Sequence, residues 1–562
     1  MKSMTNKYLY LSLLLITGLG SFLLFYHLGA RPLYNPDEGR YTQIACEMID
    51  RNDWVEPRLY NLDYLAKPVL FYWLTIISFK IFGISEFAGR FMPALFALFG
   101  VIATFFFVKK VVNLRAAFFS ALVLVLNFWY IQVGRFMVID MVFSFFIVSS
   151  LYLFYLGLTE KKHKKVYYPL FYASLALAFL TKGLACFFLV GIPIGGYLIA
   201  TGNIKVSSRK RYHLLGLFIF AVIAGSWLIH IIEREPEFLW LFIVHEHLSR
   251  FTSNDFEHQQ PWFFYLVLTP LLLTPWTFFV GPLQLLFSKF KNDHKNLLLY
   301  LLFSGGGIIL FFSVSQTKLP TYCVPALPFF CILIGTIWSK LTDELRTSIS
   351  FYRKTLAGSI ILIVISLAVT IVSLFFFDLF EAEFPIRKEL LAASGIYAAS
   401  AFACLFFLKK RLISGIFYTL SVMMCLILIP VNNGLSNVVD KLYTTKHFAE
   451  TLKPMLKSTD RVFIYGNPTH FYDLQYYLGH PVKLVGLKGE LKPKYVEEDI
   501  KEDEIGAYIP DENFNSLLLN GKPFYCISRK KDLRRLSASM NINVEIVHEN
   551  PLYVLFRSGK HQ

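Results

Sequence analysis

Charged residues are scarce in this chain. Asp, Glu, Lys and Arg together make up 17% of its 562 residues, whereas hydrophobic residues make up 55% and aromatic residues 17%. Soluble globular domains carry about 25% charged residues, so this composition argues against a soluble protein. The sequence predicts a polytopic membrane protein instead.

Acidic residues are the scarcer part of the charge: 39 Asp and Glu stand against 55 Lys and Arg, for a net charge of +16. A basic balance also fits nucleic-acid-binding proteins, but here the Lys and Arg lie in short clusters between apolar runs. The clusters occupy alternate loops, near residues 110, 163, 209, 291, 346 and 410. This is the positive-inside pattern, so we expect these loops in the cytoplasm and no nucleic acid partner.

Paired cysteines and nucleotide-binding motifs are absent. The seven cysteines include no Cys-x-x-Cys pair and mostly lie inside apolar runs, so we expect neither a disulfide framework nor a zinc knuckle. The sequence contains no P-loop and no Gly-x-Gly-x-x-Gly motif. No Ala-x-Ala site follows the first apolar run, residues 8–28, which we interpret as a retained transmembrane helix and not as a signal peptide.

Thirteen apolar runs are long enough to cross roughly 30 Å of hydrocarbon. They are residues 8–28, 86–108, 115–133, 138–158, 168–182, 184–201, 213–232, 262–287, 296–314, 321–339, 355–377, 389–408 and 412–431. After Pro430 the apolar runs end, and short β-rich pieces alternate with helical ones. We predict an all-α membrane domain of about 13 transmembrane helices over residues 1–435, followed by a small α/β extracytoplasmic domain over residues 440–562.

The unusual polar residues lie on the side opposite to the basic loops. If the basic loops are cytoplasmic, the outward side holds two long loops, residues 29–85 and 233–261, and the C-terminal domain. The first loop mixes aromatic side chains with charges, as amphipathic helices at a membrane surface do. Residues 42–50 are expected to form one such helix, ended by Asn52 and Asp53.

The first outward loop contains the adjacent carboxylates Asp37 and Glu38, which are the leading catalytic candidates. At a helix start either residue alone also fits a plain capping role. The cations Arg40, Arg58 and Lys67 follow in the same loop and are candidates for binding an anion.

The second outward loop holds His245, Glu246, His247, Arg250, Asp255 and His258. A His-x-His pair invites a metal interpretation, but residues two apart on a helix point in different directions. We therefore prefer an anion- or sugar-binding loop to a metal site.

Three further polar residues stand at the ends of apolar runs. Asp140 is a functional candidate, because a carboxylate at the start of a span is costly unless it has a partner. Lys182 and Lys318 lie at outward ends of spans, where snorkelling to the headgroups is the plain explanation. Because the positive-inside rule disfavours lysine on this side, binding of an anionic headgroup is an equal alternative.

Together these residues point to transfer of a lipid-carried sugar. Cations at a membrane surface suit a phosphate attached to a lipid, and carboxylates among aromatic rings suit a sugar. In such a transfer an acceptor oxygen attacks the anomeric carbon, and the cations stabilise the charge on the departing phosphate. A carboxylate either deprotonates a hydroxyl acceptor or steadies the oxocarbenium-like carbon.

Seven motifs occur in order along the chain: PDEGRY (36–41), DWVEPRL (53–59), YLAKPVLFYW (64–73), TKG (181–183), EHLSRF (246–251), HQQPWFFY (258–265) and FSVSQTKLPTY (312–322). This set resembles the bacterial 4-amino-4-deoxy-L-arabinose lipid A transferases and, more distantly, the dolichyl-phosphate-mannose protein mannosyltransferases, both GT-C membrane glycosyltransferases. The resemblance covers about residues 8–340. It implies a GT-C fold, a polyprenyl-phosphate sugar donor and a catalytic cavity at the periplasmic face of the bacterial inner membrane.

The resemblance also implies roles for single residues. Asp37 takes the place of the family's essential first-loop aspartate, and Asp140 that of the acidic residue at the outer end of the fourth span. Tyr41, Tyr64, Lys67, Lys182, Arg250 and Tyr322 fall where the family makes its other polar contacts. The predicted catalytic residues are thus Asp37, Glu38 and Asp140, and the predicted substrate-binding residues are Arg40, Tyr41, Arg58, Tyr64, Lys67, Lys182, His247, Arg250, His258, Lys318 and Tyr322.

The chain departs from the family at one position. The family usually reads Glu-Lys-Pro where this chain reads Ala66-Lys67-Pro68, and in some members that glutamate helps to hold a metal ion. Ala66 has no ligand atom, which argues against a divalent metal cofactor, so we predict no metal-ligating residue. The change also fits a different sugar or acceptor.

Three functions remain to be compared. The first hypothesis is transfer of a sugar, with an amino sugar among the options, from a polyprenyl phosphate to lipid A or another envelope glycolipid. The second is transfer to a protein Ser or Thr, whose hydroxyl needs a base where an ionised phosphate acceptor does not. The third is a lipid or sugar transporter, but transporters place polar residues near the membrane midplane, often in repeated halves.

Overall fold

The computed structural model describes residues 2–202, 210–244, 259–279, 294–344, 349–376, 386–486, 507–520, 523–540 and 544–558. The chain folds as two compact units. Unit 1 comprises Met1–Leu28, Arg90–Leu379 and Arg387–Asn433, and unit 2 is drawn mainly from Gly29–Gly89 and Gly434–Gln562.

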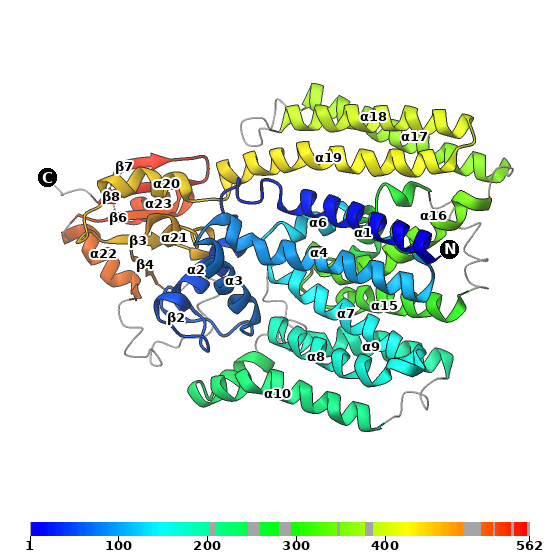
Figure 1. Cartoon of the computed structure of the whole chain (residues 1–562). Coiled ribbons are helices and arrows are strands. Elements are labelled where there is room, and N and C mark those ends of the chain that lie inside the picture. The colour runs from blue at the N-terminus through cyan, green and yellow to red at the C-terminus, as the bar shows by residue number, and fades with distance from the viewer. Residues whose placement is uncertain are drawn as a thin grey trace. The chain divides into compact units, whose positions relative to one another are not determined.

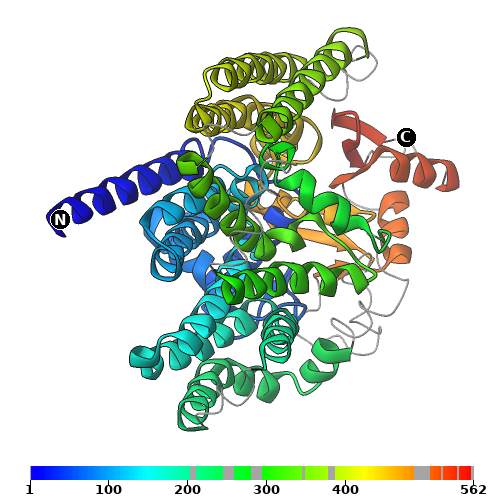
Figure 2. The same cartoon turned by 90° about the vertical axis from the view of Figure 1, so that its right-hand side faces the viewer.

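Long apolar helices make up unit 1 (Figure 1 and Figure 2). The helical elements of this part are α1 (Lys2–Phe25), α4 (Glu86–Val111), α5 (Leu114–Val125), α6 (Phe128–Gly134), α7 (Ile139–Thr159), η1 (Lys161–His163), α8 (Lys164–Lys182), α9 (Ala185–Thr201), α10 (Lys210–Arg234), α11 (Phe238–Trp240), α13 (Phe264–Leu272), η4 (Trp276–Phe279), α15 (Lys295–Val314), η5 (Pro320–Ala326), α16 (Leu327–Glu344), α17 (Ile349–Ile371), η6 (Val372–Phe376), α18 (Arg387–Lys409) and α19 (Ile413–Leu442).

Nine helices in the described part of the chain are long and apolar enough to cross a membrane, and ten if α5 and α6, bent by 64° at the break between them, form one span. The break has a local cause, because the side chain of Asn127 accepts a hydrogen bond from Tyr130 N and starts a new helix. Two further predicted runs are α8 and α9, and the run over residues 262–287 lies partly outside the described residues. The predicted all-α polytopic class is confirmed.

The interruption at Lys182 and Gly183 separates two helices. α8 ends at Lys182 and α9 begins at Ala185. Gly183 has φ 78°, in the left-handed region that a residue with a Cβ rarely adopts. α8 packs against both α7 and α10, so its end is held in place by two neighbouring helices.

Unit 2 combines segments that are far apart in the sequence. Its first segment contains α2 (Asp37–Asp50), β1 (Arg58–Leu59), β2 (Leu62–Asp63) and α3 (Leu70–Phe82). The sequence-based division assigned residues 29–85 to the membrane domain, whereas the structure groups residues 29–89 with the C-terminal segment.

The second segment of unit 2 is a small α/β fold, drawn in orange to red in Figure 1. Its elements are α20 (Lys446–Leu452), η8 (Lys453–Met455), β3 (Val462–Tyr465), η9 (Pro468–His470), α21 (Leu474–Leu478), β4 (Val482–Val485), β5 (Tyr508–Ile509), α22 (Asp511–Asn520), β6 (Tyr525–Arg529), α23 (Lys530–Met540), β7 (Val544–Glu549) and β8 (Tyr553–Ser558). The strands form one sheet in the order β5-β4-β3-β6-β8-β7, parallel from β5 to β6 and antiparallel beyond. Phe463, Phe514 and Phe556 pack in its core, and the predicted small α/β domain is confirmed.

α2 begins five residues earlier than the helix predicted for residues 42–50, and it ends at Asp50 as predicted. Asn52 follows with φ 51°, a conformation incompatible with continuing the helix. Glu47, inside the helix, is buried and accepts hydrogen bonds from Gln43 Nε2 (2.7 Å), Tyr60 N (2.8 Å) and Asn61 N (2.9 Å). These bonds join α2 to the turn of the β1–β2 hairpin and so hold the two elements of the first loop together.

Candidate functional site

Asp37 is the first residue of α2 and forms an ion pair with Arg40, one helical turn later. The Asp37 side chain is 40% exposed and that of Arg40 is 12% exposed. The Arg40 guanidinium lies 5.3 Å from the ring centre of Tyr41 and 5.9 Å from that of Tyr64. The structure therefore brings four predicted site residues together: an accessible carboxylate, a cation that orients it and two aromatic rings.

Glu38 has a different environment from its neighbour. Its side chain is completely buried. The carboxylate pairs with Arg31 at 3.1 Å and accepts a hydrogen bond from Tyr34 N at 2.8 Å. Because residues next to each other on a helix point about 100° apart, only one of the two carboxylates can face out here. Glu38 holds the loop before α2 in place, and its catalytic assignment stays a prediction without geometric support.

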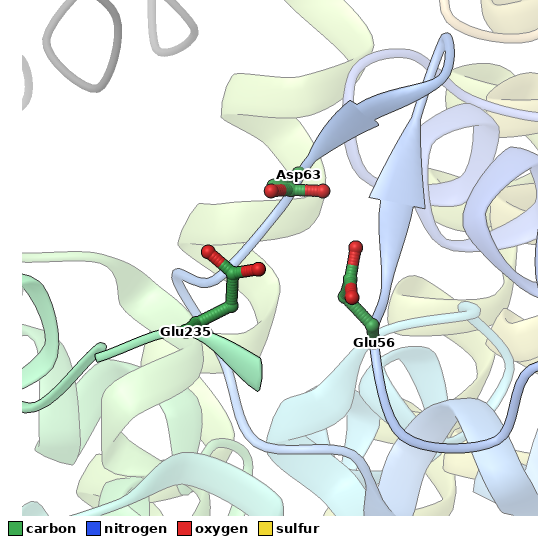
Figure 3. A group of neighbouring side chains, drawn as sticks. All are labelled: Glu56, Asp63 and Glu235. Atoms are coloured by element: carbon green, nitrogen blue, oxygen red, sulfur yellow. The ribbon is translucent and has the colours of Figure 1, made fainter. Parts of the chain in front are cut away.

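Arg58 lies between two carboxylates on the β1–β2 hairpin. Its guanidinium contacts Glu56 at 2.7 Å and Asp63 at 2.9 Å. Figure 3 shows the Glu56 and Asp63 carboxylates, which flank the hairpin. Burial and the neighbouring Asp63 raise the pKa of Glu56. A guanidinium held by two buried carboxylates has its charge already matched, so a phosphate would have to compete for it.

Tyr41, Tyr64 and Lys67 line the same loop. Both tyrosines are buried, and the Tyr41 ring packs edge-on against Phe71 at 5.1 Å. Lys67 is half-buried, and its Nζ donates to the carbonyl of Ala66 at 2.9 Å. The rings are thus fixed by packing, whereas the lysine stem reaches the surface.

In unit 1, Asp140 and Lys182 form an ion pair. Asp140 is the second residue of α7 and Lys182 the last residue of α8, and their Oδ1 and Nζ atoms lie 2.5 Å apart. Lys182 Nζ also lies 4.3 Å from the ring centre of Tyr322 on η5. The expectation that a carboxylate at the start of a span has a partner is confirmed, and three predicted site residues form one cluster.

Lys318 precedes η5 and is 4% exposed. Its Nζ donates to the carbonyl of Gln260 at 2.9 Å and to that of Ser315. An ammonium held by two carbonyls inside the protein does not snorkel, so the plain explanation given by the sequence is wrong for Lys318. The ammonium therefore ties the segment before η5 to the carbonyl of Gln260.

His247, Arg250 and His258, together with the His-x-His pair that begins at His245, lie outside the described residues. Their assignments remain predictions from the sequence.

A polar groove was not foreseen from the sequence. It has a volume of about 740 Å³ and lies within unit 2, between the end of α19, α20 and β7. His447, His548 and Asp440 line it, and His447 Nε2 lies 3.0 Å from Asp440 Oδ1. His548 lies far from Asp440 and His447 in the sequence and shares no motif with them, so the sequence alone could not predict the groove.

Comparisons with known proteins agree with this architecture. Residues 66–230 match the family described as dolichyl-phosphate-mannose-protein mannosyltransferase. The undecaprenyl phosphate-alpha-4-amino-4-deoxy-L-arabinose arabinosyl transferase of Wigglesworthia glossinidia brevipalpis is 31% identical over 357 residues, which are 62% of this chain and 63% of that protein. The corresponding transferase 1 of Proteus mirabilis (strain HI4320) is also 31% identical over 357 residues, 62% of each chain. The matched region thus spans slightly less than two thirds of these relatives.

The structure is similar to the crystal structure of ArnT from Cupriavidus metallidurans bound to undecaprenyl phosphate. The TM-score is 0.79 at 23% sequence identity, and the similarity covers 97% of this chain and 98% of that chain. The two proteins share a fold over nearly their whole length, the C-terminal α/β segment included.

Proposed function

We propose that this protein is a glycosyltransferase that moves a sugar from a polyprenyl-phosphate donor to lipid A or another envelope glycolipid at the periplasmic face of the bacterial inner membrane. The names of its relatives, the ArnT fold and the polytopic membrane architecture support this function. The observation that carries it is the accessible Asp37 carboxylate at the start of α2, paired with Arg40 and flanked by Tyr41 and Tyr64.

In this proposal Asp37 acts on the reacting atoms. It accepts the proton of a hydroxyl acceptor, or it stabilises positive charge at the anomeric carbon as the bond to the donor phosphate breaks. The ion pair with Arg40 fixes the direction of the carboxylate. Glu38 does not share this role, because its carboxylate is buried against Arg31.

The cations are assigned by their local charge balance. Lys182 is neutralised by Asp140, so this pair offers one donor and one acceptor beside the Tyr322 ring, which suits the hydroxyl or amino groups of a sugar. Lys67 is a half-buried lysine of the first loop, and its ammonium is assigned to the phosphate of the donor. Lys318 is 4% exposed and is left out of the phosphate set, since its Nζ donates to the carbonyls of Gln260 and Ser315. Arg58 is left out of the phosphate set, since Glu56 and Asp63 hold its guanidinium.

No step of the proposed mechanism uses a metal ion. Some members of the resembled family hold a metal with a glutamate at the position of Ala66, which is buried here and has no ligand atom. Catalysis is therefore derived from protein side chains, and the metal-free assignment stays a prediction.

Mass spectrometry of lipid A and of glycoproteins tests the proposal, in a host that lacks the gene and in the same host with the gene restored. The proposal expects lipid A species heavier by one sugar only when the wild-type gene is present. Restoration with Asp37→Asn, checked for equal membrane expression, serves as the control. Unchanged lipid A in the restored host would overturn the glycolipid acceptor.

Transfer to a protein Ser or Thr is the second candidate function, and the family match over residues 66–230 favours it. It predicts altered glycopeptides beside unchanged lipid A in the same experiment. The candidate of another class is a transporter, which moves its substrate across a membrane and transfers no sugar to an acceptor. Detergent offers no gradient for transport, so sugar transfer by the purified protein in detergent would contradict a transporter.

A further inference from the structure

The segment that leads into α2 packs against the C-terminal part of unit 2, and the buried carboxylate of Asp473 lies at the centre of this contact. Asp473, which immediately precedes α21, is 0% exposed. It accepts hydrogen bonds from Thr444 Oγ1 (2.8 Å), Thr445 Oγ1 (2.8 Å) and Thr445 N (2.9 Å), and from the side-chain amide of Asn35. Because four donors converge on one carboxylate, its position and orientation are fixed.

Asn35 lies two residues before Asp37. Both its side chain and its backbone N–H form hydrogen bonds with residues 443–473. Its Nδ2 donates to Asp473 and to the carbonyl of His470 (3.0 Å), and its Oδ1 accepts from Asp473 N (3.2 Å). Its backbone N donates to the carbonyl of Tyr443 (3.0 Å). Residues 443–473 therefore set the position of Asn35, which immediately precedes Pro36, the N-cap of α2.

Gly39 shows how closely the two segments approach each other. A Cβ added to this glycine would lie 2.3 Å from Asn35 Oδ1, 2.7 Å from Asp473 N and 3.0 Å from the carbonyl carbon of Tyr472. Two of these three are backbone atoms, which cannot rotate away as a side chain can. The first turn of α2 thus rests directly on the backbone at residues 472–473.

Two other contacts hold the flanks of this loop to the same part of the chain. The Tyr60 hydroxyl donates to the carbonyl of Phe471 at 3.0 Å. The Tyr477 hydroxyl accepts from Leu33 N at 2.8 Å and lies 3.2 Å from Glu86 Oε1. Contacts to residues 471–477 thus occur at Leu33, at Tyr60 and at Glu86.

We infer that Asp473 is a positioning residue for Asp37: it holds Asn35, and with Asn35 the first turn of α2, in the position from which the Asp37 carboxylate acts. The inference rests on the proposed function. It gives the C-terminal α/β segment a part in catalysis, although in the described residues its own groove and sheet carry none of the predicted catalytic groups.

The substitution Asp473→Asn tests this role. It preserves the shape of the side chain but turns an amide group toward four donors, so Asn35 loses its anionic acceptor. We expect kcat for sugar transfer to fall about 10- to 100-fold, because a displacement of a catalytic group by about 1 Å has an effect of this size. The KM for the polyprenyl-phosphate donor should stay within about twofold of wild type. A merely structural role would lower the yield of folded protein and its Tm and leave kcat per folded molecule unchanged.

Gly39→Ala is a second variant that alters no charge. Alanine is normally the better helix former, so a loss of kcat in a folded Gly39→Ala protein reports the close approach to residues 472–473. If Asp473→Asn does not fold, Gly39→Ala carries the test. Asp440→Asn is the matched control, an exposed carboxylate of the same unit that contacts His447, and its kcat is expected within twofold of wild type.

Hydrogen exchange over residues 34–41 separates this inference from the proposed function, because it needs no activity. We expect faster exchange of these amides in Asp473→Asn than in wild type and Asp440→Asn. A wild-type protein that transfers no sugar would defeat the proposed function, and the exchange result would then decide the inference alone. Unchanged exchange in folded Asp473→Asn, or kcat within twofold of wild type in the folded variants of Asp473 and Gly39, would overturn it.

Discussion

Adjacent acidic residues serve different purposes at the start of α2. Asp37 is accessible and paired with Arg40, whereas Glu38 is buried and paired with Arg31. An accessible carboxylate can reach a substrate, and a buried one can only order the chain around it. The sequence alone cannot separate them, because both side chains carry the same chemistry and stand next to each other.

Asp37→Asn is expected to abolish transfer while the protein stays folded. Asparagine keeps the shape of the side chain but cannot accept a proton, so kcat should fall about 10²- to 10⁴-fold with little change in donor affinity. Transfer rates at saturating donor measure the effect, with Tm as the check on folding. A variant with a rate near that of wild type would reduce Asp37 to a helix cap.

Glu38→Gln is expected to act on stability and not on chemistry. The substitution breaks the buried ion pair with Arg31, at a cost of about 3 kcal/mol. The Tm of the purified variant should fall below that of Asp37→Asn, while kcat per folded molecule changes less than tenfold. The reverse order of the two variants in Tm would contradict the division of roles.

Glu47 makes the stability of unit 2 depend on pH. Burial raises the pKa of Glu47 to about 7, above its ordinary value of 4.5, in spite of the hydrogen bonds that it accepts. The folded state therefore binds the proton more tightly than the unfolded state, and the stability contribution is present at low pH and lost as the pH rises through about 7. We expect the Tm of wild type to fall between pH 5 and pH 8 by more than that of Glu47→Gln. Parallel Tm curves for the two proteins would refute this.

Among the elements, α7 and α8 are joined at one end by the Asp140–Lys182 pair. The sequence predicted that Asp140, a carboxylate at the start of a span, needs a partner. It directed Lys182 to the headgroups and did not pair the two residues. Helix starts were less predictable: the first turn of α2 was missed because its polar residues, Glu38 among them, resemble a surface loop and yet are buried.

A double-mutant cycle on Asp140→Asn and Lys182→Met should show strong coupling. Each single variant breaks the ion pair and is expected to raise KM for the donor roughly tenfold. In the double variant, KM should rise by less than the product of the two single-variant increases, which corresponds to a coupling free energy of about 1 kcal/mol or more. Independent effects would mean that the two side chains act on different parts of the substrate.

At the scale of the whole molecule, unit 2 joins two segments with several hundred residues between them. Motif order allowed the fold class and the members of the first-loop cluster to be predicted. The link between Asn35 and Asp473 could not be, because 438 residues separate them and neither stands in a motif. Contacts of this kind are long-range pairings, which leave no local pattern in a single sequence.

A chain that ends at Asn433 should insert its helices and yet lack an ordered first loop. It loses Asp473, Tyr477 and every other partner that the C-terminal segment gives to residues 29–89. We expect limited proteolysis of membranes to cut the truncated chain between residues 31 and 63, at sites that are protected in the full-length protein. Equal protection in both proteins would show that the first loop folds alone.

The distance along the chain between Asn35 and Asp473 also has a consequence during synthesis. At roughly 5 to 20 residues per second, a ribosome needs roughly 20 to 90 s to add the 438 residues that separate them. Throughout that interval the loop that bears Asp37 exists without the residues that hold it. The nascent chain therefore gains the contacts that fix the first turn of α2 only after α19 has been made.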